Sequence, residues 1–167
     1  MCGDVHNMGK IIEIRLLVDL IKKMKVEGKK VVLCHGCFDL MHLGHIKHFH
    51  AAKEMGDILI LTVTPDKFVN KGPGRPVFDE NDRMESVAAL ECVDFVALNK
   101  WYSPVNTIKL LCPDIYVKGQ EYKLNAKKNK ELQKDLMAAE SVGAEMAFTH
   151  EEVYSSTELL SKYFIKK

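Results

Sequence analysis

The chain has 167 residues, of which 47% are hydrophobic and 28% are charged, and 24 basic against 23 acidic residues leave a net charge of +1. This mixture is typical of one globular domain with a core of its own, and it excludes a disordered or membrane-embedded chain. The balanced charge gives no reason to expect nucleic-acid or membrane binding, so an anionic ligand must be held by a local site.

The first half of the chain alternates amphipathic and apolar segments. Apolar residues at helical spacing predict a helix over 11–28, ended by a glycine, and a buried strand follows at 30–35. A second helix is expected over 43–56, and a strand rich in β-branched residues over 57–64. Three of the five prolines fall in 65–78, which predicts a loop.

The second half continues the alternation. The expected helices cover 79–91, 103–112, 126–142 and 155–167, and the expected strands cover 93–98, 114–119 and 144–149. Five strands separated by helices predict an α/β fold, a Rossmann-like, doubly wound, five-stranded parallel sheet with helices on both faces. We expect a single domain over 1–167, with an N-terminal extension and helix over 1–28 and a Rossmann-like core over 29–167.

The cysteines and the N-terminus bear on the compartment. Five cysteines, an odd number at irregular spacing, favour reduced thiols. The start, "MCGDVHNMGK", lacks the basic and apolar regions of a signal peptide. We therefore expect a cytoplasmic protein.

In a sheet of this kind, ligands bind at the carboxyl ends of the strands. The segments that follow the five strands therefore form one candidate site: 34–45, 64–77, 98–103, 117–122 and 149–157. The first holds "GCFDLMHLGH", in which Gly36 follows a strand and allows close backbone approach. His42 and His45 fall on the first turn of a helix, where both imidazoles and the free N–H groups suit a phosphate, and Gly44 keeps that surface open.

The other segments add charged and polar groups. Lys71 and Arg75 lie in a loop. The sequence fits a solvated turn and a lid that binds phosphate equally well. On the residues alone, Arg83 is expected to be a surface arginine. Glu121 is expected to accept a ribose hydroxyl or to lie in a charged turn. Trp101, the single tryptophan, suits the core or a stacking contact in the site.

Two alternatives use the cysteines. Cys34, Cys37, His42 and His45 superficially suggest zinc, but the gap between the pairs is far shorter than in a zinc finger. Cys34 and Cys37 also form a C-x-x-C pair, but the helix begins too late for a thioredoxin-like site. A third alternative is a nucleotide-binding module without catalysis.

Taken together, these motifs resemble a known family. "GCFDLMHLGH" is similar to the G-x-F-D-x-x-H-x-G-H pattern of the nucleotidyltransferase superfamily that includes the cytidylyltransferases. "GRPVFDENDRMESVAALECVDFV", "CPDIYVKGQEY" and "SSTELL" extend the resemblance along nearly the whole chain. They look most like the adenylyltransferase domain of the ADP-heptose synthase type.

The resemblance implies roles for particular residues. It implies charge stabilisation by His42 and His45 and phosphate binding by Lys71. The implied nucleotide-binding residues are Gly36, Cys37, Phe38, Gly44, Arg83, Lys118, Gly119, Glu121, Ser156 and Thr157. The implied substrate-binding residues are Asp39, Arg75 and Trp101. No resident metal is implied, only Mg²⁺ that accompanies the nucleoside triphosphate (NTP).

The implied reaction joins an NTP, with ATP favoured, to a sugar 1-phosphate such as heptose 1-phosphate, giving an NDP-sugar and pyrophosphate. A cytidylyltransferase that uses CTP and glycerol 3-phosphate or another polyol phosphate is the alternative. It is more distant because the related enzymes carry G-D-D where this chain has "GQE". Homodimers are common in the families that the chain resembles. Heptose-type domains are often fused to a sugar kinase, so we expect either a standalone enzyme or one domain of such a fusion.

Overall fold

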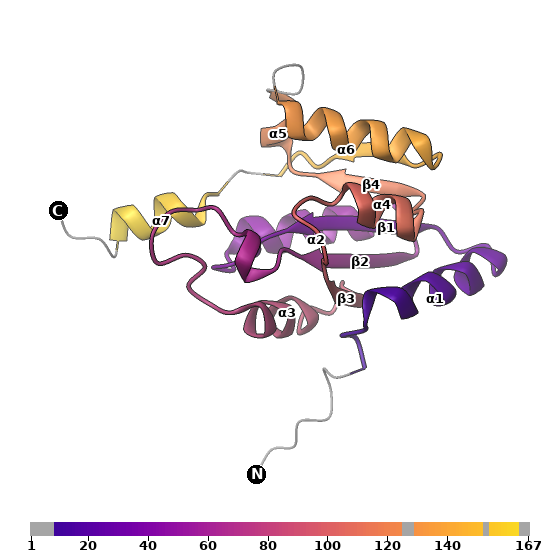
Figure 1. The fold of residues 1–167 in the computed structure, drawn as a ribbon, viewed down its shortest axis with the longest axis horizontal. Helices are drawn as coiled ribbons and strands as arrows, with labels where there is room; N and C mark the ends of the chain where they lie inside the picture. The colour runs from indigo at the N-terminus through magenta and orange to yellow at the C-terminus, as the bar shows by residue number, and fades with distance from the viewer. Residues whose placement is uncertain (1–8, 125–128, 152–153, 164–167) are drawn as a thin grey trace, which may run out of the picture.

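The computed structural model describes residues 9–124, 129–151 and 154–163. Its centre is a sheet of five parallel strands in the order β3-β2-β1-β4-β5 (Figure 1). The strands are β1 (Val31–Gly36), β2 (Ile58–Val63), β3 (Phe95–Leu98), β4 (Ile115–Lys118) and β5 (Glu145–Phe148). The predicted Rossmann-like α/β fold is confirmed.

The strand order fixes where a ligand can enter. The chain starts in the middle of the sheet at β1, builds outward through β2 and β3, and then returns to the other side of β1 for β4 and β5. The direction of winding therefore reverses between β1 and β4. In sheets of this class the crevice for ligands opens at this point, beyond the carboxyl ends of the strands.

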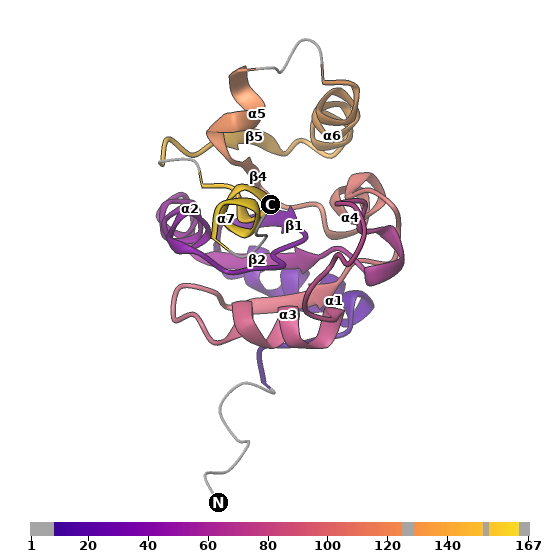
Figure 2. The same ribbon diagram turned by 90° about the vertical axis from the view of Figure 1, so that its left-hand side faces the viewer.

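Helices cover both faces of the sheet (Figure 2). They are α1 (Ile14–Val26), α2 (Leu43–Lys53), α3 (Glu80–Ala88), α4 (Val105–Leu111), α5 (Gln120–Leu124), α6 (Lys130–Ser141) and α7 (Ser156–Tyr163), with a short 3₁₀ turn, η1 (Asp66–Phe68). One hydrophobic core lies between the sheet and α2 and α3, and a second lies between the sheet and α1, α4 and α6.

The side-chain alternation of the strands feeds both cores. In β1, Val32 and Cys34 join the core under α2 and α3, whereas Val31 and Leu33 join the opposite core. All four are fully buried, as expected for a central strand of a parallel sheet.

Two predicted helices differ from the structure at their starts. The helix expected from residue 11 begins at Ile14, because the Glu13 side chain caps the amide of Arg15. Ile11 instead pairs with Val96 of β3. The helix expected over 126–142 is α6, which starts at Lys130 where Asn129 caps two backbone amides. The separate helix α5 was not predicted. The start of the helix predicted over 126–142 and the end of the helix predicted over 155–167 fall partly at 125–128 and 164–167, which lie outside the described residues. Within the described ranges, no helix is both long and apolar enough to cross a membrane.

Candidate active site

A cavity of about 530 Å³ opens at the carboxyl ends of the strands, and all five strand-end segments contribute to it. It is lined by these residues with predicted roles: Gly36, Cys37, Phe38, His42, His45, Lys71, Lys118, Gly119, Glu121, Ser156 and Thr157. Gly44 lines a smaller adjoining cavity of about 80 Å³, which shares His42, His45 and Glu121 with the larger one. Asp39, Arg75, Arg83 and Trp101 line neither cavity.

The turn between β1 and α2 is shaped by Phe38. Its φ of 51° is in the left-handed region that side chains rarely adopt, and its ring is buried against Phe49 and His45. A Cβ at Gly36 would lie 2.6 Å from the Phe38 ring. Glycine is therefore required at position 36 so that Phe38 can fold back and form a firm wall behind His45.

His42 and His45 lie one above the other at the start of α2. His42 is the N-cap residue, and the two rings stack with centroids 3.9 Å apart. The Nδ1 atoms of both rings are buried and have no hydrogen-bond partner among the described residues. A buried polar atom without a partner is costly, so two of them beside a cavity indicate a ligand that completes their hydrogen bonding.

These histidines are neutral at physiological pH. Burial lowers the pKa of His45 to about 3, helped by His42, Lys71 and His48. Burial, and then the charge of Lys71, also lowers the pKa of His42. A neutral imidazole donates one N–H and accepts at the other nitrogen. Each of the two rings can therefore donate one hydrogen bond to an anion although it carries no positive charge.

Gly44 does not face open space, contrary to the sequence prediction. A Cβ there would lie 2.8 Å from the ring of Tyr154, which precedes α7. The absent side chain thus allows Tyr154 to pack against the start of α2, where its ring centroid is 5.9 Å from that of His42. Tyr154 was not predicted as a site residue, and it brings the chain before α7 to the histidine pair.

The loop between β2 and α3 carries Lys71 to the cavity and is anchored behind it. Asp39 is buried and accepts hydrogen bonds from Arg75 Nε at 2.6 Å, from the Val77 amide at 2.8 Å and from the Phe78 amide at 3.1 Å. Burial alone would raise the pKa of Asp39, but the hydrogen bonds from the Phe78 amide and Arg75 outweigh it and hold that pKa below its usual value. Asp39 therefore holds the base of the loop rather than facing the cavity.

Arg83 corrects the expectation of a surface arginine. It is fully buried. Its guanidinium donates to the carbonyl oxygens of Cys37 at 2.5 Å and Thr64 at 2.8 Å, to that of Phe78 at 3.0 Å, and to Asp66 Oδ1 at 2.6 Å. These acceptors come from the ends of β1 and β2 and from the loop after β2. Arg83 thus ties the walls of the site together from behind and makes no contact with the cavity.

Trp101 also lies away from the cavity. It packs against the core formed by α1, α4 and α6, because the loop folds around Asn99, whose side chain donates to the carbonyl oxygens of Trp101 and Ser103. From this loop, the aromatic side chain that lines the cavity is that of the neighbouring Tyr102.

The remaining predicted residues close the site from β4 and α7. A Cβ at Gly119 would collide with the carboxylate of Glu121, so glycine allows Glu121 to fold over the strand end. Ser156 and Thr157 begin α7, and their hydroxyl oxygens lie 3.5 Å from the guanidinium nitrogens of Arg75. Arg75 therefore connects the loop that carries Lys71 to the start of α7.

Several residues that line the cavity were not predicted to belong to it. His35 Nδ1 lies 3.0 Å from Thr62 Oγ1, and His48 Nδ1 lies 2.9 Å from Thr149 Oγ1. Burial lowers the pKa of His35 to about 3 and that of His48 to about 4. His48 follows His45 by three positions, which is the one sequence signal that could have placed it on the same helix face. Asp135, on α6, had no such signal.

The cysteine alternatives find no support in this geometry. Cys34 is buried in the core, where burial raises its pKa far above the usual value, and burial also raises the pKa of Cys37. Both are free thiols. Among the described residues, no three His, Cys, Asp or Glu side chains gather closely enough to hold a metal ion.

Comparisons with known proteins agree with the geometry. The family described as cytidylyltransferase-like matches residues 33–162. The bifunctional protein HldE of Trichlorobacter lovleyi is 43% identical over 115 residues, covering 68% of this chain and 23% of that protein. HldE of Sulfurimonas denitrificans is 46% identical over 105 residues, covering 62% of this chain and 22% of that protein. The chain thus spans about a quarter of the length of these relatives.

A solved structure shows the same fold. The crystal structure of the lipopolysaccharide core biosynthesis protein from Thermoplasma volcanium GSS1 matches with a TM-score of 0.59 and 27% sequence identity. The match covers 75% of this chain and 100% of that one.

Proposed function

The chain belongs to the cytidylyltransferase-like family of nucleotidyltransferases, and from this we propose that it transfers a nucleotidyl group from an NTP, with ATP favoured, to a sugar 1-phosphate. The products are an NDP-sugar and pyrophosphate. The observation that carries the proposal is the pair of neutral histidines at the start of α2, whose buried Nδ1 atoms have no partner in the described structure and which share a cavity with Lys71.

This arrangement suits attack on a triphosphate. The acceptor phosphate attacks the α-phosphorus in line, the bond to the β-phosphate oxygen breaks, and pyrophosphate leaves with the electron pair. A phosphate monoester is already a nucleophile near neutral pH, so the protein supplies position and charge stabilisation rather than a base. In this proposal His42 and His45 donate to the triphosphate oxygens as charge develops, and Lys71 binds the leaving phosphates.

We propose that Mg²⁺ enters with the NTP. The described residues bring together no three groups that could form a protein cage for the ion. Mg²⁺ is commonly held by substrate phosphates with few protein ligands, and it would screen the triphosphate charge here. Glu121, which lines both cavities, is the carboxylate we expect nearest to the ribose or the ion.

We favour ATP and a sugar phosphate over CTP and glycerol 3-phosphate because the motifs resemble those of the ADP-heptose synthase type. Relatives that match at 37–46% identity include several HldE proteins, which are named bifunctional and support this resemblance. We further propose that this chain carries the nucleotidyl-transfer function of such a protein and that a sugar kinase supplies its phosphorylated acceptor. The family description itself keeps CTP as the second candidate nucleotide.

The proposal is tested by combining the four NTPs with heptose 1-phosphate, mannose 1-phosphate and glycerol 3-phosphate and measuring pyrophosphate release. We expect the highest kcat/KM with ATP and a sugar 1-phosphate. Preference for CTP with glycerol 3-phosphate would establish the alternative. Tight NTP binding without turnover of any pair would instead indicate a binding module.

A further inference from the structure

The main cavity extends across the edge of the sheet, and its far end contains charged residues that have no role in the mechanism above. The histidine pair lies on the side of α2. In β4, Tyr116 belongs to the core under α4 and α6, and Val117 belongs to the core under α2 and α3. Alternation therefore directs Lys118 back toward α6, where Asp135 lines the same cavity.

Lys118 and Asp135 form a buried ion pair at this end. Lys118 Nζ lies 3.2 Å from Asp135 Oδ2, and the two residues are 8% and 3% exposed. The hydroxyl of Tyr116 donates to the same Oδ2 at 3.2 Å. Both contacts use Oδ2, so Oδ1 keeps its capacity to accept a hydrogen bond. Charges are buried at considerable cost, and a pair that also faces a cavity is well placed to bind a polar ligand.

The electrostatics of this pair favour neutral polar groups over a second anion. Burial alone would lower the pKa of Lys118, but Tyr116 and Asp135 outweigh it, so that pKa is raised and the ammonium stays charged. Burial raises the pKa of Asp135. The negative carboxylate offsets the lysine, so a triphosphate gains little here, whereas hydroxyl groups can donate to the carboxylate.

The surrounding walls suit a sugar. Ser103 and Pro104 line the cavity where α4 begins, and Tyr102 stands at its rim with 64% exposure and an edge contact to Phe68 at 5.9 Å. On the other side the Tyr122 ring lies 4.7 Å from Lys118 Nζ. Aromatic faces with a few placed polar groups are typical of sites that bind small polar molecules.

We propose that this end of the cavity, formed by Lys118, Asp135, Tyr102 and Ser103, is the acceptor subsite, and that Asp135 accepts hydrogen bonds from the hydroxyl groups of a polyhydroxylated sugar phosphate. Lys118 holds the carboxylate in place, and the acceptor phosphate points away from this pair toward the histidine end, where it must lie for attack. This inference rests on the proposed function and narrows its substrate class to acceptors with several hydroxyl groups, rather than to short polyol phosphates.

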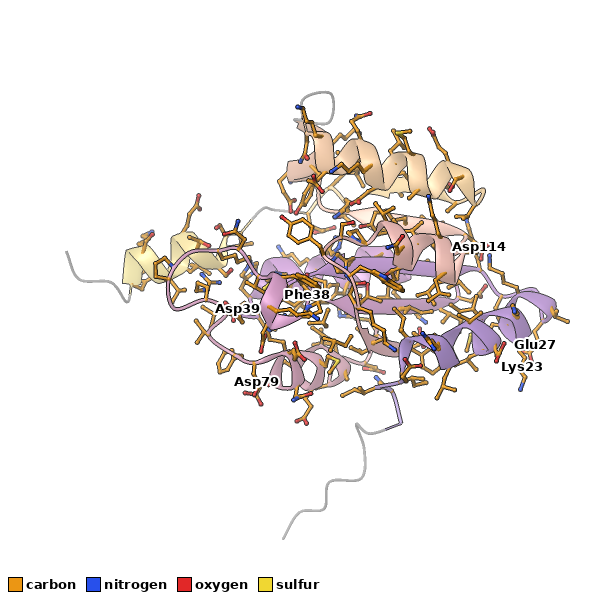
Figure 3. The ribbon with its side chains drawn as sticks, in the orientation of Figure 1. Lys23, Glu27, Phe38, Asp39, Asp79 and Asp114 are labelled. Atoms are coloured by element: carbon orange, nitrogen blue, oxygen red, sulfur yellow. The ribbon has the colours of Figure 1, made fainter. Side chains whose placement is uncertain are left out.

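The experiment compares Asp135→Asn with Asp114→Asn. Asp114 pairs with Lys25 at 2.9 Å and lies at the opposite end of the sheet, as Figure 3 shows from the positions of Asp114 and Phe38. In pyrophosphate-release assays, D135N should raise the KM for mannose 1-phosphate or heptose 1-phosphate at least about tenfold and leave the KM for ATP within about twofold. D114N should change neither. An equal rise in both KM values for D135N, or no rise in either, would overturn the subsite.

A binding measurement separates this inference from the proposed reaction. Calorimetry with a non-hydrolysable ATP analogue bound to the wild-type chain gives the Kd of mannose 1-phosphate and of its singly deoxygenated analogues. Loss of at least one hydroxyl should weaken binding about tenfold or more, because Oδ1 of the buried Asp135 carboxylate then lacks the donor that the sugar supplied. Equal Kd values for all analogues would refute the subsite even if D135N does not fold. Sugar binding without pyrophosphate release would instead refute the proposed reaction alone.

Discussion

Two groups of nitrogen-bearing side chains build the site, one lining the cavity and one behind its wall, and they differ in how fully their hydrogen bonds are used. Arg83 and Arg75 lie behind the wall, and their guanidinium groups are bonded to carbonyl, carboxylate and hydroxyl oxygens. His42 and His45 line the cavity, and each has a buried Nδ1 without a partner in the described ranges. The satisfied groups hold the site together, whereas the histidine rings keep hydrogen-bonding capacity that no described residue uses.

Removing Arg83 should have the largest effect on the fold. Arg83→Met leaves the carbonyl oxygens of Cys37 and Thr64 without their buried donor and Asp66 without its cation. We expect a loss of about 3–5 kcal/mol in the free energy of unfolding, measured by urea denaturation. Exposed Arg15→Met is the control and should change it by less than about 0.5 kcal/mol. If R83M is as stable as R15M, then Arg83 is not what ties the two strand ends together.

The histidines should show the opposite pattern. His42→Ala and His45→Ala should each lower kcat about 10²–10³-fold in pyrophosphate release, because each removes a donor aimed at developing charge. Their free energy of unfolding should fall less than that of R83M, because each change removes ring packing but no hydrogen bond to Nδ1. His50→Ala, an exposed change on the same helix, is the control. Wild-type turnover in both variants would contradict the proposed mechanism.

The neutral histidines also predict a sensitivity to acid. Because burial lowers the pKa of His35 to about 3, the unfolded chain binds more protons than the folded one between pH 3 and pH 6.5. The contribution of neutral His35 to the free energy of unfolding is fully present above pH 6.5. It is lost as the pH falls toward 3, by up to about 1.4 kcal/mol per pH unit. Urea denaturation at pH 7.5, 6 and 5 should show a shallower decline for His35→Gln than for the wild type. Parallel declines would show that His35 is not the titrating group.

The same contrast explains what could be predicted from the sequence. The alternation of five strands with helices and the position of His42 and His45 after the first strand follow from local patterns, and the fold was predicted on that basis. The strand order comes from the structure alone. Arg83 was misplaced because its acceptors are mostly backbone carbonyls of other segments, which no residue pattern reveals. Asp135 was missed because its partner Lys118 lies on another element, and only the packing of α6 against the sheet brings them together.

Substitution of Cys37 should have the smallest effect on turnover and stability. It tests whether the backbone of Cys37, rather than its thiol, contributes to the site. Its carbonyl oxygen accepts from Arg83 at 2.5 Å, whereas its sulfur is 3.9 Å from the same nitrogen, too far to add much. Cys37→Ser keeps the backbone contact, so turnover should stay within about twofold and stability within about 1 kcal/mol of the wild type. The Cys34→Ser, Cys37→Ser double variant should also keep its turnover. A loss of about 100-fold in the single variant would mean that the thiol itself acts in the site, and Cys37 would then belong with the histidines rather than with Arg83.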